Sequence, residues 1–357
     1  MPRASGRGGA PVPTRMRAVT FHGPGDIRYG TVPVPRPGPG EVLVRVQVAL
    51  TCSTDVKTFR RGHPVMIQEI PTLFGHEFAG EVAAVGEGVE RFGVGQRVTA
   101  ANSVPCFACE YCRRGRENLC ERLLFMNGAF AQYIRVPAPL AAVNLFALPD
   151  DLPAREAAFL EPLACVLHGI DQAAVRADDT VAILGTGPIG LLLLQAARLR
   201  GARCVAVGRG ALRLSRAYAC GADAVVDLAA APDVPAAIRE RTPGGLGPDI
   251  VIEAVGRPEA WEQAAATVRK GGRVVFFGGC APGTEVHLDT RRVHYEELTL
   301  LGIFHHTAGH VREALRLLAE RRLALEPLLS HEMPLKDLEA ALTAMERGEA
   351  LKVVIIP

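Results

Sequence analysis

Short apolar runs with an alternating pattern dominate the first part of the chain, over about residues 17–161. Valine occupies every second position of Val42–Val48, within Glu41–Leu50, and this period of two is typical of a strand. Phe78–Val85 and Arg97–Ala100 contain similar runs. With the frequent Pro and Gly between them, these runs predict a β-rich, partly barrel-like domain.

The pattern changes near Asp178, where short apolar strands begin to alternate with helices. Val181–Leu184 predicts a strand, and the largely apolar Ile189–Arg200 predicts a helix. The alternation continues with strands at Cys204–Val207, Ala224–Val226, Ile250–Ile252 and Val274–Phe277 and helices at Leu212–Cys220 and Glu259–Arg269. Strand and helix repeating at this spacing predict an α/β fold with a doubly wound parallel sheet, covered by helices on both faces.

The two ends of the chain do not follow this alternation. Residues 1–16 are rich in Pro, Gly and Arg and lack an apolar core, so we expect a disordered tail and not a secretory signal. Leu298–Phe304 predicts a last strand of the sheet. Beyond it, helices near Val311–Glu320 and Leu335–Arg347 and a strand at Lys352–Ile356 are expected to return to the first domain.

The length of 357 residues also indicates two domains, because it exceeds what one compact core usually holds. We expect the β-rich domain to hold residues 17–164 and 304–357. We expect the α/β domain to hold residues 165–303.

The net charge of +2 gives no indication of the strongly basic surface that binds nucleic acid or an anionic membrane. No apolar run reaches the length of a membrane span, since Val181–Ala197 is interrupted by glycines and a proline. These features predict a cytoplasmic globular protein without nucleic-acid or membrane partners.

Four of the nine cysteines lie on one short segment, as Cys106, Cys109, Cys112 and Cys120. Four thiolates enclose a zinc ion tetrahedrally and leave no open position, which predicts a structural site. An iron–sulfur cluster also uses four cysteines, and the spacing alone does not distinguish the two. Free buried cysteines and a nucleic-acid-binding zinc ribbon are the weaker alternatives.

A second group of candidate ligands is mixed. Cys52 follows a predicted strand, His76 and Glu77 follow a turn, and Glu161 lies at the end of the first domain. A catalytic zinc ion takes about three protein ligands and an exchangeable water. Taken singly, each residue is a weak signal, because a lone histidine is more often a core residue and Glu161 could be a surface charge.

The segment from Gly185 to Gly190 reads Gly185-Thr-Gly187-Pro188-Ile189-Gly190 and joins a predicted strand to a predicted helix. In that context the three glycines indicate a dinucleotide site, where the backbone approaches a pyrophosphate at a helix N-terminus. Val255 and Gly278 follow later strands and are further candidates for cofactor contact.

The next strand of this domain bears on the cofactor. An NAD-binding chain usually carries Asp or Glu about twenty residues after the glycines, whereas this chain has Gly208 and Arg209. Gly208 would leave room for a 2′-phosphate, Arg209 could pair with it, and Arg213 could assist. We therefore expect NADP(H); the alternative is an exposed Arg209 in an enzyme that uses NAD(H).

Together these motifs resemble the zinc-containing medium-chain dehydrogenases, most closely the branch of sorbitol and threonine dehydrogenases, which has Glu161-Pro162 where other members have a third cysteine ligand. The resemblance implies a GroES-like catalytic domain beside a Rossmann domain. It implies that Cys52 and His76 bind zinc and that Glu77 or Glu161 completes the sphere, directly or through water. It also implies homodimers or homotetramers, with Leu298–Phe304 a candidate strand for subunit pairing.

The resemblance further implies roles for residues around that zinc. Asp55 would orient the His76 ring, and Thr54 would bind the substrate oxygen and pass on its proton.

The chain departs from the family at three places. The family's proton relay often has a histidine where this chain has Lys57, which is a relay residue, an exposed lysine or a lysine that only contacts the cofactor. Thr58 replaces the polyol-binding tyrosine of sorbitol dehydrogenases, and His305 and His306 replace an Arg-Tyr pair. We expect Thr58, His305 and His306 to line the substrate pocket, in which the positions that would hold a polyol have changed. The alternative is that the two histidines lie in a surface loop.

The resulting hypothesis is a zinc-dependent oxidoreductase that moves hydride between a secondary alcohol or ketone and NADP(H). The alternatives are an NAD-dependent polyol or amino-alcohol dehydrogenase, a zinc-free quinone reductase of similar fold, and a non-catalytic zinc-ribbon interaction protein.

Overall fold

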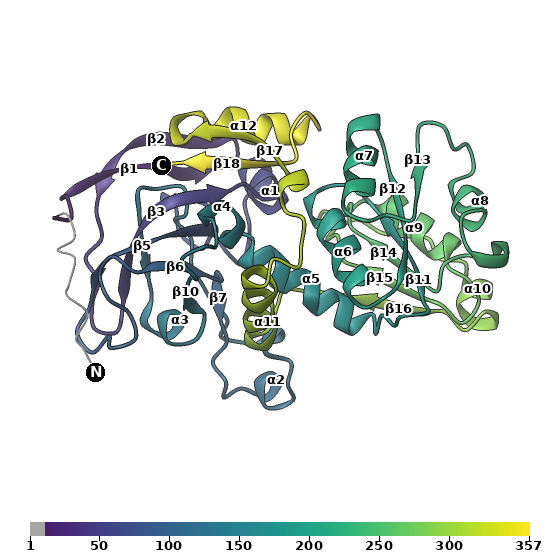
Figure 1. Cartoon of the computed structure of the whole chain (residues 1–357), viewed down its shortest axis with the longest axis horizontal. Coiled ribbons are helices and arrows are strands. Elements are labelled where there is room, and N and C mark those ends of the chain that lie inside the picture. Colours follow the sequence, from purple (N-terminus) through teal and green to yellow (C-terminus); the bar gives the residue numbers. More distant parts are fainter. Residues whose placement is uncertain (1–10) are drawn as a thin grey trace. The chain divides into compact units, whose positions relative to one another are not determined.

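The structure is a computed structural model that describes residues 11–357 (Figure 1). It divides into two compact units. The first holds the described residues up to Ala164 together with Thr307–Arg322 and Leu329–Pro357, and the second holds Cys165–His306 and Leu323–Leu328. The units differ from the expected domains in that residues 304–306 and 323–328 join the second unit.

The main sheet of the first unit has the strand order β10-β6-β5-β3-β18-β17, and β9 pairs with β3. Its strands are β3 (Val42–Leu50), β5 (Glu77–Val85), β6 (Arg97–Ala100), β9 (Tyr133–Val136), β10 (Leu145–Ala147), β17 (Leu329–Pro334) and β18 (Lys352–Ile356). The strands predicted from alternation are therefore confirmed. β18 lies beside β3 although the two are far apart in sequence, so the end of the chain does return to the first unit (Figure 1).

A smaller sheet and several short helices complete the first unit. The smaller sheet has the order β2-β1-β4, and β7 pairs with β8. These strands are β1 (Arg15–Gly23), β2 (Asp26–Pro33), β4 (Thr72–Leu73), β7 (Ser103–Val104) and β8 (Leu124–Phe125). The helices and 3-10 turns are α1 (Ser53–Arg61), α2 (Glu110–Arg113), η1 (Glu117–Leu119), α3 (Ala138–Val143), α4 (Ala154–Ala157), α11 (Ala308–Ala319), η4 (Leu335–Asp337) and α12 (Leu338–Glu346).

The expected tail of residues 1–16 needs a correction at its end. Residues 1–10 lie outside the described residues. Arg15 and Met16 belong to β1, and Met16 packs in a small core cluster with Ala18 and Leu43, so burial of its side chain extends the ordered strand into the expected tail.

The second unit contains a parallel sheet in the order β13-β12-β11-β14-β15-β16 (Figure 1). Its strands are β11 (Thr180–Leu184), β12 (Arg203–Gly208), β13 (Ala224–Asp227), β14 (Ile250–Glu253), β15 (Arg273–Phe276) and β16 (Thr299–Gly302). Its helices and turns are α6 (Pro188–Leu199), α7 (Ala211–Ala219), α8 (Val234–Arg239), η2 (Pro243–Gly245), α9 (Pro258–Thr267), α10 (Thr290–Tyr295) and η3 (Glu326–Leu328), and α5 (Leu160–Gln172) crosses the boundary between the units.

The doubly wound fold expected from the sequence is confirmed. All residues of β11 and β14 are buried, as continuous apolar runs in a two-sided parallel sheet require. Helices α6 and α7 pack beside each other, and so do α8 and α9, which is what right-handed crossovers on the two sides of β11 produce. Across residues 11–357, we find no helix of the length and apolarity that a membrane crossing demands.

Candidate metal centres and dinucleotide site

Cys52 occupies the corner between β3 and α1, where it caps the helix N-terminus. Its Sγ accepts the Thr54 backbone N–H at 3.4 Å, and the Asp55 carboxylate accepts the Cys52 backbone N–H at 2.8 Å. This reciprocal cap holds the sulfur at the positive end of the helix dipole.

His76 lies next to this corner and is held by the same Asp55. Its Nδ1 lies 3.1 Å from Asp55 Oδ1, and both side chains are buried. With Nδ1 as the donor, Nε2 is left as the ligand atom, the usual arrangement of a metal-binding imidazole. Burial lowers the pKa of His76, but the Asp55 carboxylate and Cys52 outweigh that effect and keep the pKa well above its ordinary value.

Gly75 allows the chain to reach this position. Its φ of +87° is in the left-handed region that favours glycine, and a Cβ there would lie 2.5 Å from the Phe130 ring. The close approach of Phe130, which also packs on Phe74, thus fixes the backbone just before His76.

Glu77 is completely buried at the start of β5. Its Oε2 accepts a hydrogen bond from Lys352, whereas Oε1 has no hydrogen-bond partner within residues 11–357. One ligand atom each of Cys52, His76 and Glu77 lies within 4.8 Å of the others. A buried carboxylate oxygen without a partner is costly, and a cation bound between these three atoms would offset that cost.

The charge balance of the group also fits a cation. Burial raises the pKa of Glu77 to about 7, and the nearby Glu161 carboxylate adds to the rise, although Lys352 and His76 oppose it. Thiolate, imidazole and carboxylate together are ligands that suit zinc.

The other predicted residues of this site lie on the helices α1 and α5. Glu161 is in the first turn of α5 and is 7% exposed. Thr54 and Lys57 lie on α1 and are partly exposed, whereas Thr58 is buried on the same helix.

The sequence analysis did not assign any role to Lys352, which is 1% exposed in β18. Its ammonium group donates to the Thr51 carbonyl oxygen at 2.8 Å and to Glu77, and it lies 5.6 Å from the centre of the Phe159 ring. The sequence feature that could have indicated a role for Lys352 is its place at the start of the apolar strand Lys352–Ile356, in a chain with only a few lysines.

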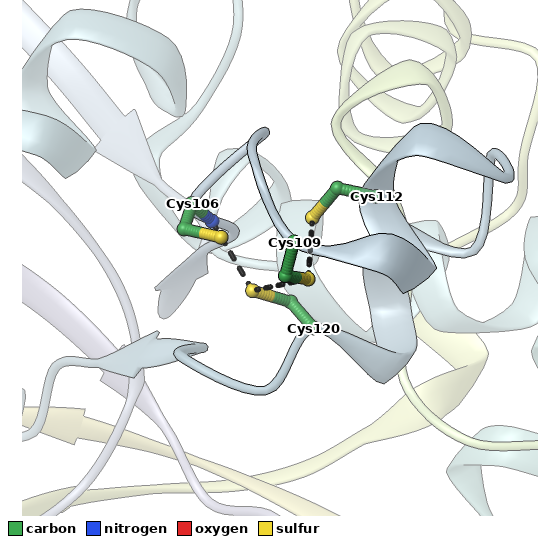
Figure 2. Close-up of side chains that lie close together, drawn as sticks. All are labelled: Cys106, Cys109, Cys112 and Cys120. Atoms are coloured by element: carbon green, nitrogen blue, oxygen red, sulfur yellow. Dashed lines mark hydrogen bonds between the residues drawn. The ribbon is translucent and has the colours of Figure 1, made fainter.

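The four-cysteine segment folds so that its sulfur atoms point toward one another (Figure 2). All four thiols are free, and their sulfur atoms lie within 4.8 Å of one another. The Cys109 sulfur lies 3.5 Å from that of Cys112 and 3.9 Å from that of Cys120. A tetrahedral ion with zinc–sulfur bonds of about 2.3 Å would place its ligands about 3.8 Å apart, close to these values.

The thiols do not share one pKa shift. Hydrogen bonding from the Ala108 backbone lowers the pKa of Cys106 to about 6, whereas burial raises the pKa of Cys112 to about 12. Because burial opposes ionisation of Cys112, all four groups can be thiolates together only when a cation lies between them. A single ion fits the sulfur distances better than an iron–sulfur cluster, whose thiolates bind different iron atoms and would lie farther apart.

The predicted dinucleotide loop lies between β11 and α6. Gly187 is the N-cap of α6, Pro188 begins the helix, and Ile189 follows it. A Cβ on Gly190 would lie 1.8 Å from the Gly185 carbonyl oxygen, so this close packing requires glycine. The free N–H groups of the first turn face the end of the sheet, as in a pyrophosphate site.

The expected room beside Gly208 is taken up by another residue. Gly208 is buried, and a Cβ there would lie 2.1 Å from Thr186 Oγ1, so the missing side chain accommodates Thr186. Arg209 is exposed just after β12, and Arg213 is partly buried on α7. Burial lowers the pKa of Arg213, and the neighbouring Arg216 lowers it further.

Arg216 was not singled out in the sequence. Its Nη1 atom is buried and has no hydrogen-bond partner in the described part of the chain. The sequence feature that could have indicated a role for Arg216 is its spacing of three residues from Arg213, since this spacing places both arginines on one face of α7.

The remaining candidates follow later strands of the second unit. Val255 is 43% exposed, and Gly278 is partly buried. The rings of His305 and His306 lie 3.9 Å apart, and His306 is buried. His168 on α5 contacts the His305 carbonyl oxygen through Nδ1 at 2.8 Å, so it supports this segment; the sequence analysis missed it.

Two family models match the chain. The alcohol dehydrogenase GroES-like domain matches residues 38–150, and the zinc-binding dehydrogenase model matches residues 188–320. Erythritol/L-threitol dehydrogenase of Mycolicibacterium smegmatis is 33% identical over 97% of this chain and 99% of its own length. Sorbitol dehydrogenase of Bacillus subtilis is 32% identical over 97% of this chain and 98% of its own length.

Solved structures agree with these relatives. A structure from Sinorhizobium meliloti 1021, assigned to the zinc-binding dehydrogenases and bound to NADP, has a TM-score of 0.88 and 34% identity over 97% of this chain and 100% of that chain. 2R,3R-butanediol dehydrogenase from Bacillus subtilis has a TM-score of 0.84 and 31% identity over 96% of this chain and 99% of that chain. The chain thus belongs to the zinc-dependent medium-chain alcohol dehydrogenases, in the branch of sorbitol and threonine dehydrogenases, and transfers hydride between an alcohol or ketone and a nicotinamide cofactor.

Proposed function

We propose that this dehydrogenase holds its catalytic zinc with Cys52, His76 and Glu77, and that Glu161 reaches the metal through water. The observation that carries the proposal is the buried Glu77 carboxylate: its Oε1 has no hydrogen-bond partner within residues 11–357, and one of its oxygens lies within 4.8 Å of the Cys52 and His76 ligand atoms. It also favours Glu77 over Glu161 as the direct ligand, because Glu77 is the carboxylate grouped with Cys52 and His76.

A zinc ion in such a site acts as a Lewis acid that lowers the pKa of a bound alcohol. The protein's residues then have separate tasks. Asp55 holds the His76 ring by the 3.1 Å contact to Nδ1. The Thr54 hydroxyl accepts the proton of the substrate alcohol, and Lys57 passes that proton to solvent.

The second zinc ion is structural and is held by Cys106, Cys109, Cys112 and Cys120. The support is the close group of four sulfur atoms, which leaves no position for substrate. We therefore propose one catalytic and one structural zinc ion per chain.

NADP(H) is the preferred cofactor in this proposal. Arg209, Arg213 and Arg216 bring three guanidinium groups to the end of β12 and the adjoining α7. Burial and the charge of Arg216 both lower the pKa of Arg213; a 2′-phosphate would offset these effects and would supply an acceptor for the buried Nη1 of Arg216. The solved relative from Sinorhizobium meliloti, bound to NADP, supports the same choice.

The proposed substrates are secondary alcohols and the corresponding ketones, and Thr58, His305 and His306 stay predicted substrate-binding residues. A polyol or vicinal diol is the second candidate, and the names of the erythritol/L-threitol, sorbitol and butanediol dehydrogenases among the relatives favour it.

We also propose that the chain forms a homodimer or homotetramer. β16 is at the end of the sheet order, so its outer edge is available for pairing with a second copy. The expected cytoplasmic location and the expected lack of nucleic-acid and membrane partners stay predictions.

The decisive experiment is a panel of secondary alcohols, vicinal diols, polyols, threonine and ketones, assayed with NADP(H) and NAD(H) by nicotinamide absorbance and combined with metal analysis. We expect turnover of a secondary alcohol and a higher kcat/KM with NADP(H). Turnover that persists after complete zinc removal would refute the catalytic-zinc assignment. Tight cofactor binding without any turnover would instead favour the non-catalytic alternative.

A further inference from the structure

Glu253 links two backbone turns at the carboxyl end of the parallel sheet. It is the last residue of β14, and its side chain is 0% exposed. Its Oε1 accepts the backbone N–H groups of Val255 at 2.6 Å and Gly256 at 2.8 Å. Its carbonyl oxygen accepts the N–H groups of Phe277 and Gly278, each at 3.0 Å, so one residue holds the turns after β14 and β15.

These two turns are packed against each other without spare room. A Cβ on Gly278 would lie 2.4 Å from the Gly256 nitrogen and 2.9 Å from Glu253 Oε2. On the α9 side, the Trp261 indole N–H donates to the Gly278 carbonyl oxygen at 2.9 Å. The positions of both turns are therefore set by Glu253 and its immediate neighbours.

The topology indicates which part of the cofactor these turns receive. The order of the sheet reverses at β11, with β12 on one side and β14 on the other, and a dinucleotide lies across this point with one mononucleotide on each half. The glycine loop and Arg209 belong to the β11–β12 half. The ends of β14 and β15 therefore face the other mononucleotide, which carries the nicotinamide.

Val255 connects the two halves. A Cβ on Gly185 of the glycine loop would lie 3.1 Å from Val255 Cγ2, so the turn after β14 abuts the pyrophosphate loop. Val255 is 43% exposed although apolar, which leaves its side chain available for a flat ring. A shift of this turn would thus change the surface offered to the nicotinamide.

We propose that Glu253 is a positioning residue for hydride transfer, which fixes the turns at Val255–Gly256 and Gly278 so that they receive the nicotinamide and its ribose. Glu253 acts through these backbone groups and does not touch the cofactor. The inference rests on the nicotinamide cofactor of the family and is independent of the choice between NADP and NAD.

The test compares binding of the whole reduced cofactor with binding of a fragment that lacks nicotinamide, ADP-ribose or its 2′-phosphate. Glu253→Gln weakens the hydrogen bonds to the two turn amides. We expect the dissociation constant of the whole cofactor to rise about tenfold, and that of the fragment to change less than about twofold. The KM for the cofactor should rise with it.

Gly278→Ala tests the same geometry without changing a charge, because the added methyl group displaces the two turns. It should reproduce the selective loss for the whole cofactor. Glu262→Gln is the matched control, since Glu262 is a more exposed carboxylate that accepts the His287 backbone N–H at 2.8 Å elsewhere in the second unit. It should leave both dissociation constants unchanged.

Equal weakening of cofactor and fragment in Glu253→Gln would show a general role in folding of the second unit and would overturn the proposal. Unchanged binding of both would overturn it as well. If Glu253→Gln fails to fold, Gly278→Ala decides by the same comparison. Failure of this test leaves the zinc site and the substrate panel untouched, so the two proposals are separable.

Discussion

Lys352 and Glu77 form a buried ion pair within the first unit, with Lys352 1% exposed and Glu77 0% exposed. The two residues come from β18 and β5, which lie on opposite sides of β3 in the sheet. The pair leaves one carboxylate oxygen of Glu77 bonded and the other without a hydrogen-bond partner in the described chain. Lys352 thereby opposes the rise in the pKa of Glu77 that burial causes, while one oxygen of Glu77 lies close to the Cys52 and His76 ligand atoms.

Lys352→Met is expected to destabilise the protein by about 3 kcal/mol and to lower its zinc content. The substitution leaves a buried carboxylate without its cation, which is more costly than losing the whole pair. The free energy of unfolding, measured by urea titration, and the zinc content check the expectation. The double variant Glu77→Gln/Lys352→Met should lose less stability than the sum of the single variants. Strict additivity would show that the pair is not coupled.

Glu77→Gln and Glu161→Gln are expected to differ in metal retention. Glu77→Gln removes the charge of the proposed direct ligand, so the zinc content should fall from about two ions per chain to about one. Glu161→Gln should keep both ions and lose mainly kcat. Competition with a chelator, followed by metal analysis, measures the difference. A reversed order would assign the direct ligand to Glu161.

The alternation of apolar residues was sufficient to predict the sheet of the second unit and several strands of the first, because buried strands must be apolar on defined faces. It did not predict β1 and β2 or the helices α1 and α5. In α1, Ser53–Arg61 carries mostly polar residues, and its start depends on the cap formed by Cys52 and Asp55. α5 is apolar over much of its length, but a helix buried on several sides has no clear polar face.

The ligand residues of the candidate sites were visible in the sequence because their types and spacing are specific. The supporting residues were not. Lys352 and His168 act through contacts between distant segments: 275 positions separate Lys352 from Glu77, and 137 separate His168 from His305. Gly208 illustrates the same limit, since the residue that occupies the space beside it, Thr186, is set by tertiary packing.

Cys112→Ser is expected to remove only the structural zinc. A tetrahedral thiolate site that loses one sulfur ligand binds zinc far more weakly, so metal content should fall to about one ion per chain. The melting temperature should fall, because the segment around the site would lose its cross-link. Cys204→Ser, which alters a buried cysteine away from both sites, should retain both ions. Loss of both ions in Cys112→Ser would contradict independent sites.

Lys57→Ala is expected to change the pH–rate profile of alcohol oxidation. If Lys57 passes the substrate proton to solvent, its loss should slow the reaction about tenfold at the acid end of the profile. At alkaline pH the rate should approach that of the wild type, because hydroxide can then take the proton. Lys57→Arg is the matched control: it keeps the positive charge but cannot release a proton near neutrality. It should therefore behave as Lys57→Ala does, and unchanged profiles would remove Lys57 from the mechanism.

Arg209→Ala and Arg216→Ala are expected to reduce the preference for NADP(H). A guanidinium bonded to a phosphate contributes about 1.5–3 kcal/mol, so each variant should lose about tenfold or more in kcat/KM with NADP+. With NAD+, which lacks the 2′-phosphate, the change should stay within about twofold. Arg200→Ala is a suitable control, because Arg200 pairs with Asp171 at 2.6 Å at the end of α6. Equal losses with both cofactors would assign these arginines to the fold of the second unit, whereas a wild-type preference for NAD+ would overturn the proposed cofactor.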